Sequence, residues 1–267
     1  MEITITSEEE ETLQKQLAGR HDPESRRLVR FLAMPDLSRT PGSPINELVR
    51  RILEVKDFSG FDVIRVPEIV PVDVSFDLFD FPQDHPARSR SDTYFVGDTH
   101  VLRTHTTVMW YYYLKEDSIR KKIAEGMPVG SLSYGKVYRK DEIDRQHMNV
   151  FHQMDGWYLC RKAEKVITAE DLQHVLVNIA KAVFGEDVKY QFKEDTFPYT
   201  DPSLEMQINV SGGPDAEGIE DPRFEDRASR ESNRDKWGEI LGSGVVKGSV
   251  REKLGVDPDV YNGWAFG

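Results

Sequence analysis

Residues 135–156 read GKVYRKDEIDRQHMNVFHQMDG and decide the fold. The stretch opens with an alternating segment, Val137 to Lys140, that is typical of a β-strand. A polar run from Asp141 to Asn149 follows, and an apolar alternation resumes at Val150. This order predicts an antiparallel hairpin whose loop is too long for a tight turn. Because ordering such a loop costs entropy that binding or packing must offset, we expect the loop to be functional.

The composition is that of a globular chain with one large or two small domains. The chain has 267 residues, 38% of them hydrophobic and 31% charged, and a net charge of −12. This acidic balance argues against a membrane surface or a general nucleic-acid coat, while a local basic patch for RNA stays open. The single cysteine, Cys160, excludes an internal disulfide and a cysteine-built zinc site. With no apolar run of membrane-spanning length and an N-terminus too acidic for a signal peptide, we expect a cytoplasmic protein.

Helices are predicted on both sides of the hairpin. Ser43 and Pro44 supply a capping residue and a first-turn proline, and apolar residues then recur at helical spacing. A second helix is expected after Thr168-Ala-Glu-Asp171, which resembles a capping box, with Gly185 as its stop. Residues 1–40 are charged and weakly periodic, which favours a solvated helix or a mobile arm.

Strands are expected in the remaining periodic segments, near residues 92–96, 188–192, 205–210 and 237–246. Residues 76–88 and 212–236 lack a period and are expected to be a loop and a solvated insertion. Strands outnumber crossover helices and are often linked as hairpins. The sequence therefore predicts an α+β fold, with a mostly antiparallel sheet flanked by helices.

The hairpin also carries the side chains best suited to chemistry. Arg139 can direct two N–H groups onto a phosphate, and Asp141 is expected on the same strand face. Phe151 offers a ring on which a base can stack. Gln153 and Asp155 share that face by the period of two, and could accept hydrogen bonds from an ammonium group. Together these groups suit a nucleotide and an amino acid lying side by side.

Further motifs occur in the order found in one known family. They are GFD (60–62) through Pro67, PQDHPAR (82–88), LRTHT (102–106), FPYTDPS (197–203), WGEILGSG (237–244) and DPDVYNGWAFG (257–267). With these motifs and the hairpin, the chain from about Ser43 onward resembles the catalytic core of the α subunit of phenylalanyl-tRNA synthetase, a class II aminoacyl-tRNA synthetase. The resemblance implies the class II synthetase fold for residues 41–267, preceded by a charged arm or helix over residues 1–40.

The resemblance also implies an activity and partners. The chain would activate L-phenylalanine with ATP to the aminoacyl-adenylate and transfer it to tRNA(Phe), without a protein nucleophile. Catalysis would rest on positioning and on charge neutralisation by arginine and Mg²⁺. The implied partner is a phenylalanyl-tRNA synthetase β subunit, in a heterotetramer located in the cytoplasm.

The resemblance assigns the ATP side of the site to five residues. Arg139 would hold the α-phosphate of ATP and the amino acid carboxylate. Asp141 would contact the adenine side or the metal-bound phosphates, and His147 would face ATP from the loop. Phe151 would stack on adenine, and Glu239 would help to hold Mg²⁺.

The amino acid side is assigned in the same way. The ammonium and carboxylate of the amino acid would be held by His105, Thr107, Gln153 and Asp155. Its side chain would lie against Phe197 and Tyr199, with Ala265 and Gly267 as the floor of the pocket.

The sequence departs from the family pattern at several positions. Asp155 replaces the usual glutamate, Tyr199 replaces a pocket phenylalanine, and Ser91 stands where a larger ring-bearing residue is common. The family continues from AFG into motif 3, a helix whose arginine grips the far phosphates of ATP and which lies beyond Gly267, so the domain is expected to be incomplete at this end. These departures leave another amino acid substrate open. They also leave open a paralogue that binds ATP or an amino acid without aminoacylation, in a regulatory or structural role.

Overall fold

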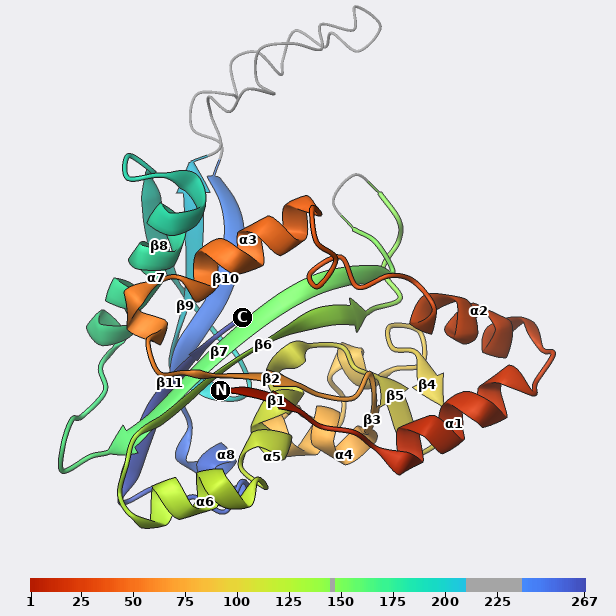
Figure 1. The fold of residues 1–267 in the computed structure, drawn as a ribbon, viewed down its shortest axis with the longest axis horizontal. Helices are drawn as coiled ribbons and strands as arrows, with labels where there is room; N and C mark the ends of the chain where they lie inside the picture. The colour runs from red at the N-terminus through yellow and green to blue at the C-terminus, as the bar shows by residue number, and fades with distance from the viewer. Residues whose placement is uncertain (145–146, 210–236) are drawn as a thin grey trace, which may run out of the picture.

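The computed structural model describes residues 1–144, 147–209 and 237–267 of the chain (Figure 1). Within these residues the main sheet has eight strands, in the order β1-β2-β6-β7-β11-β10-β9-β8. The strands are β1 (Glu2–Thr4), β2 (Asp62–Arg65), β6 (Val129–Tyr138), β7 (Val150–Arg161), β8 (Tyr190–Asp195), β9 (Thr200–Asn209), β10 (Trp237–Val246) and β11 (Tyr261–Phe266). Pairs β1–β2 and β2–β6 are parallel and the others are antiparallel. The predicted, mostly antiparallel sheet is confirmed.

A smaller sheet in the order β3-β5-β4 lies beside the main one. Its strands are β3 (Ile69–Pro71), β4 (Phe95–Val96) and β5 (His100–Leu102). The helices are α1 (Glu8–Ala18), α2 (Pro23–Leu32), α3 (Pro44–Leu53), α4 (Val72–Ser75), α5 (Met109–Tyr113), α6 (Asp117–Ala124), α7 (Ala169–Phe184) and α8 (Gly248–Lys253). None of the helices in the described ranges is both long and apolar enough to cross a membrane.

Strands β6 and β7 form the predicted hairpin. Their pairing runs from Val129 opposite Leu159 to Tyr138 opposite Val150, so the strands are longer than the sequence alone indicates. Because side chains alternate along a strand, Phe151, Gln153 and Asp155 share one face of β7, and the residues between them share the other. The hairpin thus divides its side chains between two sides of the sheet.

Helices α3 and α7 pack together against one face of the sheet, and α3 passes close to β10 in Figure 1. Helix α7 begins with the capping box that the sequence predicts, in which Thr168 and Asp171 exchange hydrogen bonds. Its apolar face, which includes Leu172 and Leu176, packs with Phe266 in one core cluster. Both predicted helices, from Pro44 and from Ala169, are confirmed.

The other face of the sheet is covered by α4, α5 and the turns around them. Its core contains Trp110 of α5 and Trp157 of β7, both fully buried, together with Phe79. The predicted loop over residues 76–88 is irregular apart from two short 3-10 helices, Asp77–Phe79 and Pro86–Arg88. The insertion expected at residues 212–236 lies outside the described residues.

Residues 1–40, predicted to be a charged helix or mobile arm, form β1, α1 and α2. The helical alternative therefore agrees with the structure, but the segment is packed rather than extended from the domain. Leu17, Leu28 and Phe31 are buried in a core cluster with Tyr94 and Tyr138. Apolar burial at these few positions offsets the cost of ordering the charged residues around them, and Glu10 adds hydrogen bonds from the backbone N–H groups of Glu68 and Ile69.

Candidate active site

A cleft of about 460 Å³ opens between helices α3 and α7 and strands β7, β10 and β11, and Ser38 of the segment before α3 also lines it. Arg139, Phe151, Gln153, Glu239 and Gly267 all border it. These residues come from the hairpin, from β10 and from the residue after β11. The fold therefore brings together much of the predicted site from segments far apart in the sequence.

Arg139 follows the last residue of β6 and is held by backbone contacts. Its Nε donates to the carbonyl oxygen of Thr104 at 3.1 Å, and its backbone N–H donates to Asn149 at 3.1 Å. The guanidinium carbon lies 5.1 Å from the centre of the Phe151 ring, a cation–π contact. No hydrogen bond of its two terminal nitrogens occurs within the described part of the chain, so they are available to an anion.

Asp155 is the most strongly perturbed acid of the site. Its carboxylate is 3% exposed and accepts hydrogen bonds from the hydroxyls of Thr106 and Thr107, the second at 2.6 Å. Burial raises the pKa of Asp155 to about 6, against the opposing effect of the two hydroxyls and of Arg139. Thr106 was not among the predicted residues, although it stands in the LRTHT motif beside two that were.

Gln153 and Gly267 complete this part of the site. The side-chain oxygen of Gln153 is buried without a hydrogen-bond partner among the described residues, so it offers a free acceptor. A Cβ atom added to Gly267 would lie 2.5 Å from an Asp155 carboxylate oxygen and 3.1 Å from the Gln153 amide nitrogen. Glycine at position 267 thus keeps the space beside both side chains clear.

His105 lies behind the site rather than on its surface. Its Nε2 is 3.0 Å from the carbonyl oxygen of Ser75, and its ring packs against Phe79 and Phe81. Burial lowers the pKa of His105 to about 4, so the ring is neutral at pH 7. With Nε2–H donating to Ser75, Nδ1 is a lone-pair acceptor that has no partner among the described residues. The ring borders neither the cleft nor the small cavity beside it.

The predicted side-chain pocket is present but nearly closed. Thr107, Asp155, Phe197, Tyr199, Ala265 and Gly267 line a cavity of about 10 Å³, which is room for one water. The rings of Phe197 and Tyr199 stack with centres 6.2 Å apart across its entrance. With the two rings in these positions, the cavity is too small to hold a phenyl ring.

Two tryptophans that the sequence reasoning missed pack beneath this cavity. Trp110 and Trp157 stack with ring centres 5.2 Å apart, and Trp110 meets Tyr199 edge-on at 6.1 Å. Both indole nitrogens are buried without a hydrogen-bond partner in the described ranges. Trp110 ends the unusual run THTTVMW (104–110), and this run could have indicated its place near the site. Trp157 could be placed there only once the register of β7 was known.

Asp141 and His147 are not brought to the cleft. His147 is exposed in the hairpin loop and lies 3.0 Å from Asp144. Asp141 is anchored by its carbonyl oxygen, which accepts from the Asn149 side chain at 2.8 Å. Their contacts with ATP therefore stay predictions.

Glu239 faces the cleft from β10 in acidic surroundings. Burial and the nearby carboxylates of Glu205 and Asp195 raise the pKa of Glu239. No group of three or more His, Cys, Asp or Glu side chains that could hold a metal occurs in the part of the chain that the structure describes. A pair of carboxylates suits Mg²⁺ that arrives with phosphate oxygens as its other ligands, which is how Mg²⁺ is usually bound.

Comparison with known proteins shows the family of this chain. Residues 32–267 match the family model described as tRNA synthetases class II core domain (F). The chain is 33% identical over 225 residues to the phenylalanine–tRNA ligase alpha subunit of Caldicellulosiruptor bescii, a match that covers 84% of the chain and 59% of that relative. It is 31% identical over 256 residues to the subunit of the same name from Chlorobium phaeovibrioides, covering 92% of the chain and 68% of that relative.

The fold is also similar to that of a solved pyrrolysyl tRNA synthetase from Desulfitobacterium hafniense. The TM-score is 0.54 at 13% identity, over 99% of this chain and 88% of that one. This likeness bears on the fold alone, and it confirms the predicted class II architecture. The chain belongs to the tRNA synthetases class II core domain (F) family.

Proposed function

We propose that this chain is the α subunit of a phenylalanine–tRNA ligase, which activates L-phenylalanine with ATP and transfers it to tRNA(Phe). The observation that carries the proposal is the convergence on one cleft of Arg139, the Phe151 ring and the acceptor Gln153, with Asp155 lining the small cavity that shares Gly267 with this cleft. A cation, a flat ring and a pair of oxygen acceptors match the phosphate, the adenine and the ammonium of the two substrates. The names of the similar proteins favour phenylalanine as the amino acid.

On the ATP side, Arg139 is the group that meets the α-phosphate. Its guanidinium now lies over the Phe151 ring, where adenine would stack, so a bound nucleotide would displace it towards the phosphates. An oxygen of the amino acid carboxylate then attacks the α-phosphorus, the bond to the bridging oxygen breaks, and pyrophosphate leaves. Arg139 stabilises the charge that develops on the α-phosphate oxygens.

On the amino acid side, the ammonium is met by acceptors only. Asp155 in its ionised form and the free oxygen of Gln153 would accept its hydrogens. Holding the amino acid at both ends would orient its carboxylate towards the phosphorus. The side chain would enter between Phe197 and Tyr199 after those rings turn.

Glu239, with Glu205 beside it, is the pair that would hold Mg²⁺ together with ATP oxygens. The ion would supply charge neutralisation at the phosphates. In the second step, a ribose hydroxyl of tRNA attacks the carbonyl carbon of the adenylate and AMP leaves, again with no protein nucleophile.

The chain spans 59% of the length of the Caldicellulosiruptor bescii relative. A β subunit and tRNA(Phe) are proposed as its partners, since the similar proteins carry the name of an alpha subunit. We propose that the assembly is a heterotetramer in the cytoplasm.

Phenylalanine-dependent exchange of pyrophosphate into ATP tests the proposal. The full-length chain is assembled with its β partner, and exchange is measured with each of the standard amino acids. We expect exchange with phenylalanine above all others. Exchange with a different amino acid would support a ligase activity but assign it another amino acid substrate. The absence of exchange with every amino acid would overturn the proposal.

A further inference from the structure

The face of the β6–β7 hairpin opposite the substrate groups is held by the segment between α2 and α3. We call residues 33–43 the connector. In the register of the hairpin, Lys136 pairs with His152 and Tyr134 with Met154. By the alternation along β7, His152 points away from its neighbours Phe151 and Gln153. The connector therefore touches the back of the strand that carries two residues of the site.

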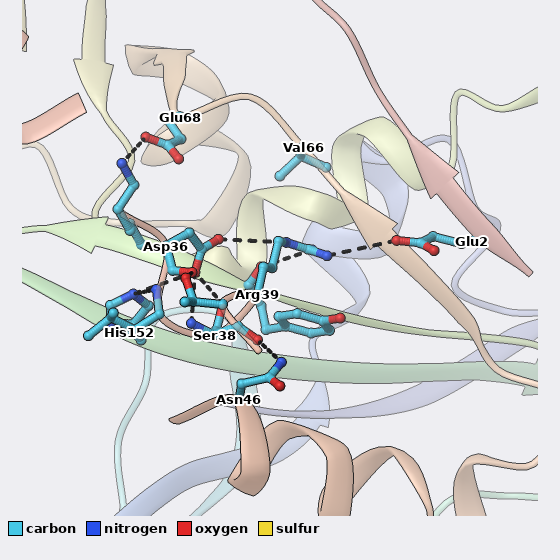
Figure 2. Close-up of polar contacts among 12 residues, drawn as sticks. Glu2, Asp36, Ser38, Arg39, Asn46, Val66, Glu68 and His152 are labelled. Carbon is cyan, nitrogen blue, oxygen red and sulfur yellow. Dashed lines mark hydrogen bonds and ion pairs between the residues drawn. The ribbon is translucent and has the colours of Figure 1, made fainter. Parts of the chain in front are cut away.

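His152 makes the central contact between β7 and the connector (Figure 2). Its Nε2 accepts the backbone N–H of Leu37 at 2.9 Å, across 115 residues of sequence. Asp36 stands beside it, with a carboxylate oxygen 3.5 Å from the same nitrogen. The His152 side chain is 12% exposed, whereas Leu37 on the donor side of the bond is exposed.

Further bonds extend this contact to both sides. Arg39 donates to the carbonyl oxygen of Tyr134 at 3.2 Å and lies 4.1 Å above its ring. Ser38 is held by Asp36 through its N–H at 3.0 Å, and its carbonyl oxygen accepts from Asn46 of α3 at 2.8 Å. A chain of hydrogen bonds thus runs from β7 through the connector into the first turn of α3, and Figure 2 shows these side chains gathered at one place.

This chain of bonds ends at the wall of the cleft. Ser38 and the α3 residues Ile45 and Leu48 border the same cleft as Phe151 and Gln153. The polar contacts around His152 thus act together with the apolar packing of α3 on α7 in holding the helix wall to the strand. A small change in those contacts would change the width of the cleft.

We infer that His152 is a positioning residue, which holds the connector and α3 against β7 and so sets the cleft that receives the nucleotide and the amino acid. His152 itself borders the cleft beside Phe151 and Gln153, and it holds the connector through the backbone N–H of Leu37. This inference rests on the proposed function, because KM and kcat are measured by the adenylation reaction.

The contact requires neutral His152, because only an unprotonated Nε2 accepts a hydrogen bond. Burial lowers the pKa of His152, so the ring is neutral at pH 7. The charged groups that face it are Asp36 from the connector, Glu68, Lys136 of β6 and Arg103. A protonated ring would lose the Leu37 bond and turn to the carboxylate of Asp36 instead, which loosens the connector at acid pH.

Two substitutions separate this role from simple packing. His152→Gln places an amide oxygen near the position of Nε2 and keeps an acceptor for Leu37, whereas His152→Leu has none. His21→Leu, at an exposed position, is the control. In the full-length complex we measure KM for ATP and kcat by pyrophosphate exchange, equilibrium binding of ATP, and amide hydrogen exchange across residues 33–43.

For His152→Leu we expect KM for ATP to rise about fivefold or more with kcat within about twofold, and exchange at Leu37 to accelerate. His152→Gln should stay within about twofold of the unmodified protein. Lowering the pH from 7 to 5 should raise KM in the unmodified protein more than in His152→Gln, because the pKa of His152 lies below its ordinary value of 6.5. Equal effects of the two substitutions, or fast exchange at Leu37 with unchanged KM and ATP binding, would overturn the inference.

Two further measurements apply if His152→Leu does not fold or if the complex is inactive. If His152→Leu does not fold, the pH profiles of the unmodified protein and His152→Gln decide, together with Asn46→Ala, which cuts the bond from the connector to α3. If the unmodified complex shows no exchange with any amino acid, the proposed function fails. The equilibrium affinity for ATP then still decides whether His152 sets the cleft, since it needs no turnover.

Discussion

The guanidinium carbon of Arg139 lies 5.1 Å from the centre of the Phe151 ring, at the loop end of the hairpin. One residue follows β6 and the other belongs to β7, so the pairing of these two strands alone brings them together. The contact joins the group that would bind phosphate to the ring that would bind adenine.

Arg139→Ala should abolish most of the adenylation activity. Charge-assisted hydrogen bonds contribute about 1.5–3 kcal/mol each, so losing two of them lowers kcat/KM by at least about 100-fold. Arg139→Lys keeps the positive charge but cannot donate two parallel hydrogen bonds to one phosphate, so its kcat/KM should lie between those of the unmodified protein and Arg139→Ala. Pyrophosphate exchange in the full-length complex measures both. Adenylation that survives Arg139→Ala nearly intact would show that another group holds the α-phosphate.

The ionisation of Asp155 predicts a pH dependence for amino acid binding. Its pKa is raised to about 6 by burial, and the ammonium is bound only by the carboxylate form. kcat/KM for the amino acid should therefore rise with pH up to about 6 and then level off. Asp155→Asn should lower the plateau about tenfold or more and remove the rise, because the charge-assisted bond is lost at every pH. If kcat/KM still rises with pH in Asp155→Asn, the titrating group is a residue other than Asp155.

The raised pKa of Asp155 also predicts that its contribution to protein stability falls with increasing pH, whereas amino acid binding improves. Between the ordinary pKa of 3.8 and the raised value of about 6, the folded state holds a proton that the unfolded state has lost. The contribution of this group to the free energy of unfolding therefore falls as pH rises through that window. Urea unfolding of the unmodified protein and of Asp155→Asn at several pH values measures the difference. A difference that does not vary with pH in this window would contradict the burial argument.

Tyr199→Phe should leave phenylalanine activation unchanged or improve it. The change removes a hydroxyl at the edge of a cavity of about 10 Å³ and leaves the ring that packs on Phe197. KM for phenylalanine should fall or stay within about threefold, while Tyr190→Phe on an exposed strand should have no effect. A large loss in Tyr199→Phe would point to a substrate that hydrogen-bonds the hydroxyl.

Glu239→Gln should raise the Mg²⁺ concentration needed for exchange. One carboxylate of the pair with Glu205 becomes neutral, which weakens the hold on the cation. We expect the half-maximal Mg²⁺ concentration to rise about tenfold, with Glu194→Gln on β8 as a control of equal charge change. A Mg²⁺ dependence that is the same in both variants would remove Glu239 from the metal site.

Thr168→Ala should destabilise the protein without touching the site. The Thr168 hydroxyl accepts the N–H of Asp171 at 3.3 Å, and Asp171 accepts the N–H of Thr168 at 2.9 Å. Loss of such a cap costs about 1 kcal/mol, while Thr168→Ser keeps the hydroxyl and should cost little. Urea unfolding measures both, and equal stability of the two variants would show that the cap contributes nothing.

The sequence by itself determined the elements whose signals are local. The hairpin follows from the alternation at 137–140 and 150–153, and α7 from its capping box and apolar period. The family was evident for the same reason, since its motifs are short runs of residues that can be recognised without coordinates. Arg139, Phe151, Gln153 and Glu239 were expected at the site, and the structure places all four on one cleft.

Only the tertiary structure decided the contacts between distant segments. The bond from Thr106 to Asp155 spans 49 residues and the bond from Leu37 to His152 spans 115, and no local pattern encodes either. The stack of Trp110 on Trp157 and the nearly closed pocket above it depend on how strands and turns pack together. Burial of a few apolar residues in α1 and α2 likewise outweighed the charged character of the first 40 residues. Hydrophobic periodicity fixes which face of an element is buried, but the partner of that face is set by the packing of the whole chain.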